Sequence, residues 1–400
     1  MNSWSDTINS LELQLTLSSE VSELEMFIQE GEKSMDFPLR DFNFPLFNYL
    51  SDQFPKHLTQ YYLTIKDPSG LLAFAAIQLV DFSFFEYINV ERFDKSEGLR
   101  NLVRKVLYKP GKLFDGKILV LGHLLLSGIN TTWTADRFPT SLKKKWWSEV
   151  MESVANNCFG GIDKFSALTI VANGNEIQRP EFDHINHWKS TDIYPIMALE
   201  LRANWKDFDD YFNALRSRYK KKIRSVNSKS DFFQVRKFNL NDVRVHRDEI
   251  MSLFKSVLDS SSYTLLEPEA SFFIELMQMD DLDYHINGVF HEGKLIAFYS
   301  WFNYDGVTEG HFLGYNKDYL YDYELYKFIL IDLIEKTIET GSKSIVLGRT
   351  ASIVKADLGA IAIPSKVLIR PVGFLRKLLF PLYYGYFYNS FSFRKRNVFH

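Results

Sequence analysis

The sequence predicts an α/β protein of two tandem domains, each a mixed and mostly antiparallel sheet flanked by helices. The chain has 400 residues, more than a single hydrophobic core usually organises. Hydrophobic residues make up 46% of it and aromatic residues 16%, which can fill two cores and excludes a disordered chain. One order of elements, a hairpin, a long strand, a helix and a strand, also occurs twice. Two copies of one α/β unit explain these observations.

The first domain is expected at residues 36–200, with its first strands near residue 61. Residues 61–82 predict two strands around a Pro-Ser-Gly turn, the second of them apolar on both faces. A further buried strand is predicted at residues 117–127, an amphipathic helix at 141–157 and a strand at 167–172.

Residues 1–35 form an acidic lead segment that is predicted to be helical or loose. Only one short run in it has helical spacing, and it consists of Val21, Leu24, Phe27 and Ile28. The start lacks a basic region followed by an apolar stretch. A standard secretion signal is therefore not expected, and a cytoplasmic location is expected. Charge is segregated by sign along the chain. Residues 1–60 hold ten acidic and three basic side chains, whereas residues 343–400 hold one acidic and ten basic side chains. The basic end predicts a phosphate-bearing ligand or an anionic membrane surface nearby.

The second domain is expected at residues 201–370. Its strands are predicted at residues 284–290, 295–303 and 308–315, and a helix is predicted at 325–340. This helix should turn its apolar residues to the core and its charged residues to solvent, namely Asp332, Glu335, Lys336 and Glu339.

The second domain opens with a predicted amphipathic helix at residues 205–225. Its apolar residues recur at three- and four-residue spacing: Phe208, Tyr211, Phe212, Leu215, Tyr219 and Ile223. Its cations lie within nine residues: Arg216, Arg218, Lys220, Lys221, Lys222 and Arg224. A solvated helix face and a surface for RNA phosphates both account for such a row of cations, and both interpretations stay open.

Residues 344–360 predict a buried strand that leads into a short helix. Gly348 and Arg349 form the exit of the strand, and Thr350 is expected to be the N-cap of the helix. Arg349 offers a planar fork for a carboxylate, a phosphate or an oxyanion, whereas Lys355 is a point charge on a flexible stem. Alternatively, Arg349 pairs with a carboxylate of its own domain and Lys355 covers a helix face.

These two segments together resemble the GNAT-related acyltransferases with a FemAB-like double domain. The first carries a W-x-x-[FY]-x-x-Y-x-x-x-[LF] helix that runs into basic residues, matched by Trp205, Phe208, Tyr211, Leu215, Ser217, Arg218, Tyr219 and Lys220. The second carries G-R-[TG]-A-x-x-x-K-x-x-[LF]-G-A, matched by Gly348, Arg349, Thr350, Ala351, Lys355, Leu358, Gly359 and Ala360. The layout resembles the family over residues 40–370.

The resemblance implies a transferase that moves an acyl group other than aminoacyl from an activated donor to an amine, in cell-envelope or lipid metabolism. It implies no permanently bound cofactor, an acyl-CoA or acyl carrier as donor, and an amine-bearing small molecule or lipid precursor as acceptor. Arg349 and Lys355 would then hold an anionic donor or stabilise the oxyanion. The residues expected to bind substrate around them are Tyr315, Thr350, Tyr219, Arg218 and Lys222.

Two alternatives remain within this resemblance. Acetyl-CoA enzymes of the superfamily hold pyrophosphate on an R/Q-x-x-G-x-G/A loop, and residues 314–326 lack these glycines, which works against CoA. FemAB-like members include transferases that take amino acids from tRNA, so the first alternative is an aminoacyl-tRNA-dependent transferase acting on a peptidoglycan precursor. The second is a double domain that has lost its chemistry and only binds.

Glu309 and His311 are candidate proton acceptors for the attacking amine. They lie two apart on a predicted strand and therefore project from the same face. Tyr315 ends this row and could act as an acid. The alternative is the outward polar face of an edge strand.

No metal site is expected. Cys158 is the only cysteine, which excludes an internal disulfide. His184 and His187 are three apart, but nothing at ligand spacing completes a site, and a surface loop explains them better. His123 is interpreted as a core histidine.

The tail, residues 371–400, has sixteen uncharged residues between basic clusters. This run is shorter than the ~20 residues that span a bilayer. Tyrosine and phenylalanine flanked by cations fit a peripheral anchor on the inner face of an anionic membrane. An aromatic arm docked on the body of the protein explains the tail equally well.

Overall fold

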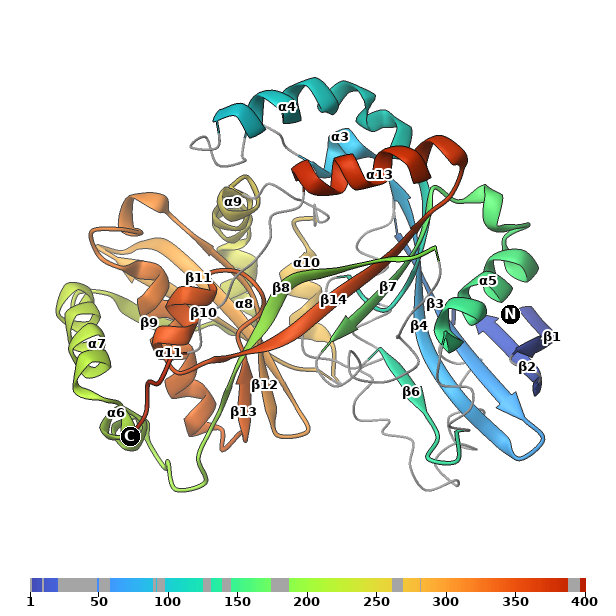
Figure 1. The fold of residues 1–400 in the computed structure, drawn as a ribbon. Helices are drawn as coiled ribbons and strands as arrows, with labels where there is room; N and C mark the ends of the chain where they lie inside the picture. The colour runs from blue at the N-terminus through green and yellow to red at the C-terminus, as the bar shows by residue number, and fades with distance from the viewer. Residues whose placement is uncertain are drawn as a thin grey trace. The chain divides into compact units, whose positions relative to one another are not determined.

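The computed structural model describes residues 2–8, 11–20, 49, 58–88, 91, 98–124, 131–138, 145–173, 187–260, 269–280, 282–387 and 396–400. The chain divides into two compact units (Figure 1). Unit 1 comprises Met1–Ile193, Ser262–Glu267 and Pro364–Phe391. Unit 2 comprises Tyr194–Ser261, Pro268–Ile363 and Ser392–His400.

Unit 1 is built on a sheet with the strand order β1-β2-β3-β4-β5-β7-β14. The strands are β1 (Asn2–Ile8), β2 (Leu11–Ser18), β3 (Leu58–Asp67), β4 (Gly70–Phe82), β5 (Gly116–Leu121), β7 (Ala167–Asn173) and β14 (Ile361–Pro371), with β6 (Thr132–Thr134) paired to β4. All of these neighbours are antiparallel except β5 and β7, which are parallel.

The N-terminal segment contains two paired antiparallel strands, so the prediction of a helical or loose start is wrong for residues 2–8 and 11–18. In β2 the buried Leu13, Leu15 and Leu17 recur at every second position. This two-residue period is that of a strand with one face on a core. The helical spacing noted in the sequence falls at residues 21–28, which lie outside the described residues.

Helix α5 (Trp146–Cys158) packs on this sheet through Trp146, Trp147 and Val150, which are fully buried. The remaining helical elements of unit 1 are α3 (Phe84–Tyr87), α4 (Gly98–Tyr108), η3 (Lys109–Phe114), η5 (Ile162–Lys164) and α13 (Phe374–Phe387). Helix α13 begins the tail and packs against Phe84 through Tyr383 and Phe387, so this part of the tail is docked on unit 1. No helix within the described residues is long and apolar enough to cross a membrane.

Unit 2 is built on strands in the order β8-β13-β12-β11-β10-β9. These are β8 (Lys189–Glu200), β13 (Ser344–Val346), β12 (Val307–Tyr315), β11 (Lys294–Tyr304), β10 (Asp283–His291) and β9 (Gln234–Lys237). All neighbours are antiparallel except β12 and β13, which are parallel. Unit 2 also contains α8 (Leu240–Val245), α9 (Arg247–Leu258), α10 (Phe272–Gln278), η8 (Lys317–Tyr319), α11 (Leu325–Glu339) and α12 (Ser352–Asp357).

The predicted helix at residues 205–225 is two helices, α6 (Phe208–Ala214) and α7 (Ser217–Ser230). The chain is extended at Leu215, which bridges to Phe399, and at Arg216, whose N–H donates to the carbonyl of Val398 at 3.0 Å. Periodicity missed the break because the apolar face continues across it: Tyr211, Leu215, Tyr219 and Ile223 are all buried.

Candidate functional site

The predicted site lies where β12 and β13 separate. The two strands pair at three positions, and the last of these joins Glu309 to Val346. Beyond Glu309, no strand among the described residues pairs with β12 on that side. The chain leaving β13 instead bonds to β8, because the N–H of Leu347 donates to the carbonyl of Met197 at 2.7 Å. A sharp turn follows, with left-handed backbone at Gly348 (φ 75°) and Ala351 (φ 53°).

Arg349 is half-buried on this turn. Its Nη1 donates a hydrogen bond of 2.8 Å to the carbonyl of Tyr194 on β8. Burial lowers the pKa of Arg349 to about 10, and the negative charge of Glu309 opposes that shift. The guanidinium therefore remains a cation at neutral pH. The alternative, in which Arg349 pairs with a carboxylate of its own domain, holds in part. The negative charge of Glu309 acts on Arg349, but the hydrogen bond of 2.8 Å goes to the carbonyl of Tyr194.

Lys355 is almost completely buried on α12, with 3% of its surface exposed. Its Nζ lies over the turn, 3.9 Å from the position that a Cβ on Gly348 would take. Burial alone lowers the pKa of Lys355 to about 7. In the described part of the chain, no hydrogen bond or ion pair joins this ammonium to a carboxylate. The alternative that Lys355 covers an exposed helix face is therefore wrong.

Thr350 is exposed and is not the N-cap of the short helix. Helix α12 is capped by Ala351, which makes no side-chain cap hydrogen bond. The prediction was one residue early because a threonine normally caps with its side chain. Here the left-handed turn at Ala351 starts the helix instead.

Glu309 and His311 share a face of the sheet, as predicted. Glu309 is 2% exposed and accepts a hydrogen bond of 3.3 Å from the hydroxyl of Tyr304. The Nδ1 of His311 lies 3.1 Å from the hydroxyl of Tyr284. Tyr284 is in register with Phe302, which is in turn in register with Glu309, so these side chains occupy one face. Both residues are at least half-buried, so they do not form an outward polar face.

Tyr315 does not continue this row, and that part of the prediction is wrong. The register between β11 and β12 shifts between Tyr299 and Trp301, where His311 and Phe312 lie opposite the single residue Ser300. Such a bulge moves every later residue to the opposite face. Tyr315 consequently packs in the apolar cluster of the other face, and burial raises its pKa.

The predicted substrate-binding residues of α7 have mixed surroundings. Tyr219 is buried, as its periodicity indicated, with Arg218 at 5.8 Å and Lys222 at 5.6 Å from its ring centroid. Lys222 makes an ion pair with Asp357 at the end of α12, and Arg396 lies 3.1 Å from the same carboxylate. Lys222 therefore ties α7 to the helix that carries Lys355. Arg218 is exposed.

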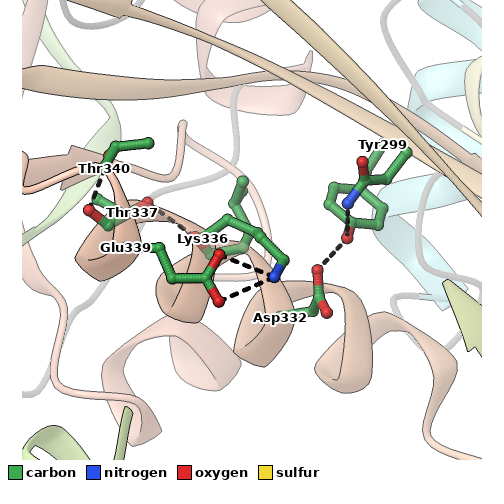
Figure 2. Close-up of polar contacts among 8 residues, drawn as sticks. Tyr299, Asp332, Lys336, Thr337, Glu339 and Thr340 are labelled. Atoms are coloured by element: carbon green, nitrogen blue, oxygen red, sulfur yellow. Dashed lines mark hydrogen bonds and ion pairs between the residues drawn. The ribbon is translucent and has the colours of Figure 1, made fainter. Parts of the chain in front are cut away.

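Sequence reasoning missed a buried polar group that joins α11 to the sheet. The hydroxyl of Tyr299 donates to Asp332, and Asn287 donates to the oxygen of Tyr299 at 2.7 Å (Figure 2). Burial raises the pKa of Asp332. Asp332 was expected to face solvent with Lys336 and Glu339, which do pair with each other on the outer side of α11. The available signal was Tyr299 itself, because a core tyrosine needs a partner for its hydroxyl.

Of the two histidine predictions for the first half, the structure describes the surroundings of His123 but not those of His184. His123 is buried, and burial lowers its pKa to about 3, so it is neutral. His184 lies outside the described residues. Within the part of the chain that the structure describes, no cluster of three or more histidine, cysteine, aspartate or glutamate residues could hold a metal ion.

No protein-family model matches the chain, and no curated protein matches its sequence. Among solved structures, FemX is similar over 84% of this chain and 92% of its own, at 9% identity and a TM-score of 0.50. A tandem GNAT protein from the clavulanic acid biosynthesis pathway covers 90% of this chain and 99% of its own, at 10% identity and a TM-score of 0.49. The structure of L-PGS from Bacillus licheniformis covers 92% and 96%, at 12% identity and a TM-score of 0.48.

Such low identities bear on the arrangement of the chain and not on its substrates. The likeness to FemX extends over most of both chains, and each unit has the mixed, mostly antiparallel sheet with helices that the sequence predicted. The chain therefore shares the fold of FemX over most of its length, which agrees with the resemblance to FemAB-like double-domain proteins that its two motifs indicated.

Proposed function

We propose that unit 2 transfers an acyl group from an activated donor, an acyl-CoA or an acyl carrier, to an amine of a cell-envelope or lipid precursor. The observation that supports this proposal best is the buried ammonium of Lys355, whose pKa is about 7 and which has no carboxylate partner in the described residues. An uncompensated buried cation destabilises a fold, so its retention favours a role toward a negatively charged ligand or transition state.

The reaction follows from the groups around that cation. The lone pair of a neutral amine attacks the carbonyl carbon of the donor thioester, a carbon–nitrogen bond forms and the carbonyl oxygen becomes negative. Arg349 and the protonated form of Lys355 stabilise this oxygen. The carbonyl then re-forms as the carbon–sulfur bond breaks. Glu309 or His311 takes the proton lost by the amine, and the departing thiolate gains a proton.

The start of α11 bears on the class of donor. Its N-cap is Glu324, whose carboxylate pairs with Lys327 and lies 3.7 Å from Lys229. A negative side chain at a helix N-terminus disfavours the binding of a diphosphate there. A donor with its phosphates bound elsewhere, such as an acyl carrier, therefore fits this helix better than CoA lying across it.

A second candidate is a transferase that takes its aminoacyl group from tRNA, and the surface of α7 favours it. The fourteen residues of α7 hold no acidic side chain, and Arg218, Lys221 and Arg224 on it are exposed. Cations of this kind bind RNA phosphates with little sequence preference. Arg224 also lies 5.3 Å from the ring of Phe212, which fixes its direction.

A panel of acyl-CoAs, acyl carrier proteins and charged tRNAs tests both candidates. A donor that binds should protect the protein against heat, and mass spectrometry of added amines should then detect the acylated product. Arg349→Ala and Lys355→Ala should abolish product formation, whereas the exposed Lys343→Ala serves as control. Unchanged turnover in both site variants would overturn the proposal. Binding without product from every donor would support a protein that has lost its chemistry.

Salt-dependent tRNA binding separates the two donors. Lys221→Glu should weaken it if tRNA is the donor, and should leave thioester-dependent turnover unchanged if it is not.

A further inference from the structure

Helix α4 of unit 1 is amphipathic, but its apolar face points outward. Leu99, Leu102 and Val106 recur at three- and four-residue spacing and are between 61% and 78% exposed. The opposite side carries Arg104, which is fully buried and donates from Nη1 to the Oδ1 of Asn101 at 2.7 Å. A surface helix of a globular protein normally has the reverse orientation. The outer face of α4 therefore suits an apolar partner outside this unit.

Helix α13 repeats this arrangement. Its inner side packs on the aromatic cluster around Phe84 through Tyr383 and Phe387. Its outer side carries four large apolar residues that are between 41% and 79% exposed: Phe374, Leu375, Leu378 and Leu382. Single exposed apolar residues are ordinary on a protein surface, but a row of them along a helix marks a site of interaction.

Hydrogen bonds join α4 and α13, and Figure 1 shows the two helices side by side. Arg100 donates from Nη2 to the carbonyl of Gly385, and Arg104 donates from Nε to the carbonyl of Tyr386, both at 2.6 Å. The hydroxyl of Tyr383 donates to the carbonyl of Leu107 at 2.8 Å. The arginines of α4 thus satisfy carbonyls in the last turn of α13, which leaves the leucines of both helices outside.

The positive charge around these two helix faces favours an anionic partner. Residues 98–114 and 374–387 contain seven basic side chains and no acidic one. Four of the seven are exposed: Lys105, Lys109, Lys112 and Lys377. Lys105 lies 3.4 Å from Glu91, but both side chains are more than half exposed, so this pair is weak. Apolar rows beside exposed cations match the headgroup region of an anionic bilayer.

We propose that the outer faces of α4 and α13 form a membrane-contact surface that lies in the headgroup region of an anionic lipid bilayer. The leucines and Phe374 enter the boundary of the acyl chains, and the lysines contact lipid phosphates. Since α4 contributes half of the surface, membrane binding does not belong to the tail alone. This inference concerns unit 1 and does not depend on the reaction proposed for unit 2.

Sedimentation with vesicles tests the inference. The full chain should bind vesicles of phosphatidylcholine with about 30% phosphatidylglycerol and should bind pure phosphatidylcholine vesicles less. Salt at about 0.5 M should release part of the bound protein. The two vesicle types and the added salt separate the contribution of charge from that of apolar contact, because the Debye length is already only about 10 Å at 0.1 M salt. Leu102→Gln and Leu378→Gln should each weaken binding about tenfold. Val106→Gln has a matched control in Val245→Gln on α8, since the two valines are 68% and 69% exposed. The control should bind as the parent chain does.

Thermal unfolding of each variant should match that of the parent, which excludes loss of the fold as the cause. Three results overturn the inference: no binding to either kind of vesicle, equal loss in the Val245→Gln control, or a dimer in sedimentation velocity that the same leucine substitutions dissociate. The last result would show that a second copy of the chain covers this face. Acyl transfer to a soluble amine is expected to survive Leu102→Gln, so failure of this inference and failure of the proposed reaction are distinguishable.

Discussion

Both units contain one parallel strand pair among antiparallel neighbours, β5 with β7 in unit 1 and β12 with β13 in unit 2, but the ionisable groups near the two pairs differ. In unit 1 the buried group that follows β5 is His123, which is neutral. In unit 2 the groups are Glu309, Arg349 and Lys355. The parallel pair of unit 1 is thus followed by a neutral buried histidine, whereas the pair of unit 2 lies beside the cations Arg349 and Lys355 and the buried Glu309. The reaction proposed for unit 2 depends on these charges and not on the strand arrangement, which both units share.

The largest expected effect comes from removing the charge of Lys355. Lys355→Met should lower turnover by about 10²- to 10³-fold, as loss of an oxyanion donor does. The same change should stabilise the fold by about 1 to 3 kcal/mol, because an apolar side chain replaces a buried cation that has no carboxylate partner among the described residues. Denaturant unfolding and turnover with the identified donor measure the two effects. Lys343→Met, at an exposed lysine, should change neither.

Asp332 tests whether the buried polar group of unit 2 is structural. Asp332→Ala should destabilise the protein by about 1 to 3 kcal/mol, because the hydroxyl of Tyr299 loses its acceptor. Asp332→Asn keeps an acceptor and should cost less. Equal unfolding midpoints for the two variants would contradict this assignment.

Stability should also depend on pH through Lys355. The folded chain releases this proton near pH 7, whereas the unfolded chain releases it near pH 10.5. Between these values the unfolded state binds more protons, so this group makes stability rise with pH by at most about 1.4 kcal/mol per unit. The rise should be present in the parent and absent in Lys355→Met. Parallel curves would show that the ammonium is not buried.

The smallest effect is expected at Lys222, whose side chain is partly exposed. Its ion pair with Asp357 should contribute less than about 1 kcal/mol, so Lys222→Met should shift the unfolding midpoint only slightly. A change in KM of tenfold or more with unchanged stability would instead support the predicted role in substrate binding.

The sequence predicted the α/β class, most strands and the shared face of Glu309 and His311, because period and turn residues are local signals. It could not predict the bulge at His311, which moves Tyr315 to the other face, because a bulge depends on the partner strand. It also missed the inward turn of Asp332, which a single tyrosine on another strand determines. The burial of Lys355 became visible only with the packing of its helix.

The last described residues, 396–400, complete unit 2 only after the chain has passed through α13 of unit 1. Phe399 bridges to Leu215, and its ring lies 5.3 Å from that of Trp205. The units therefore alternate along the chain and cannot be separated by a single cut. During synthesis, the contacts of Phe399 with Leu215 and Trp205 cannot form until this phenylalanine emerges, so the unit that holds Lys355 should complete its folding last and should be the one that a chaperone protects longest.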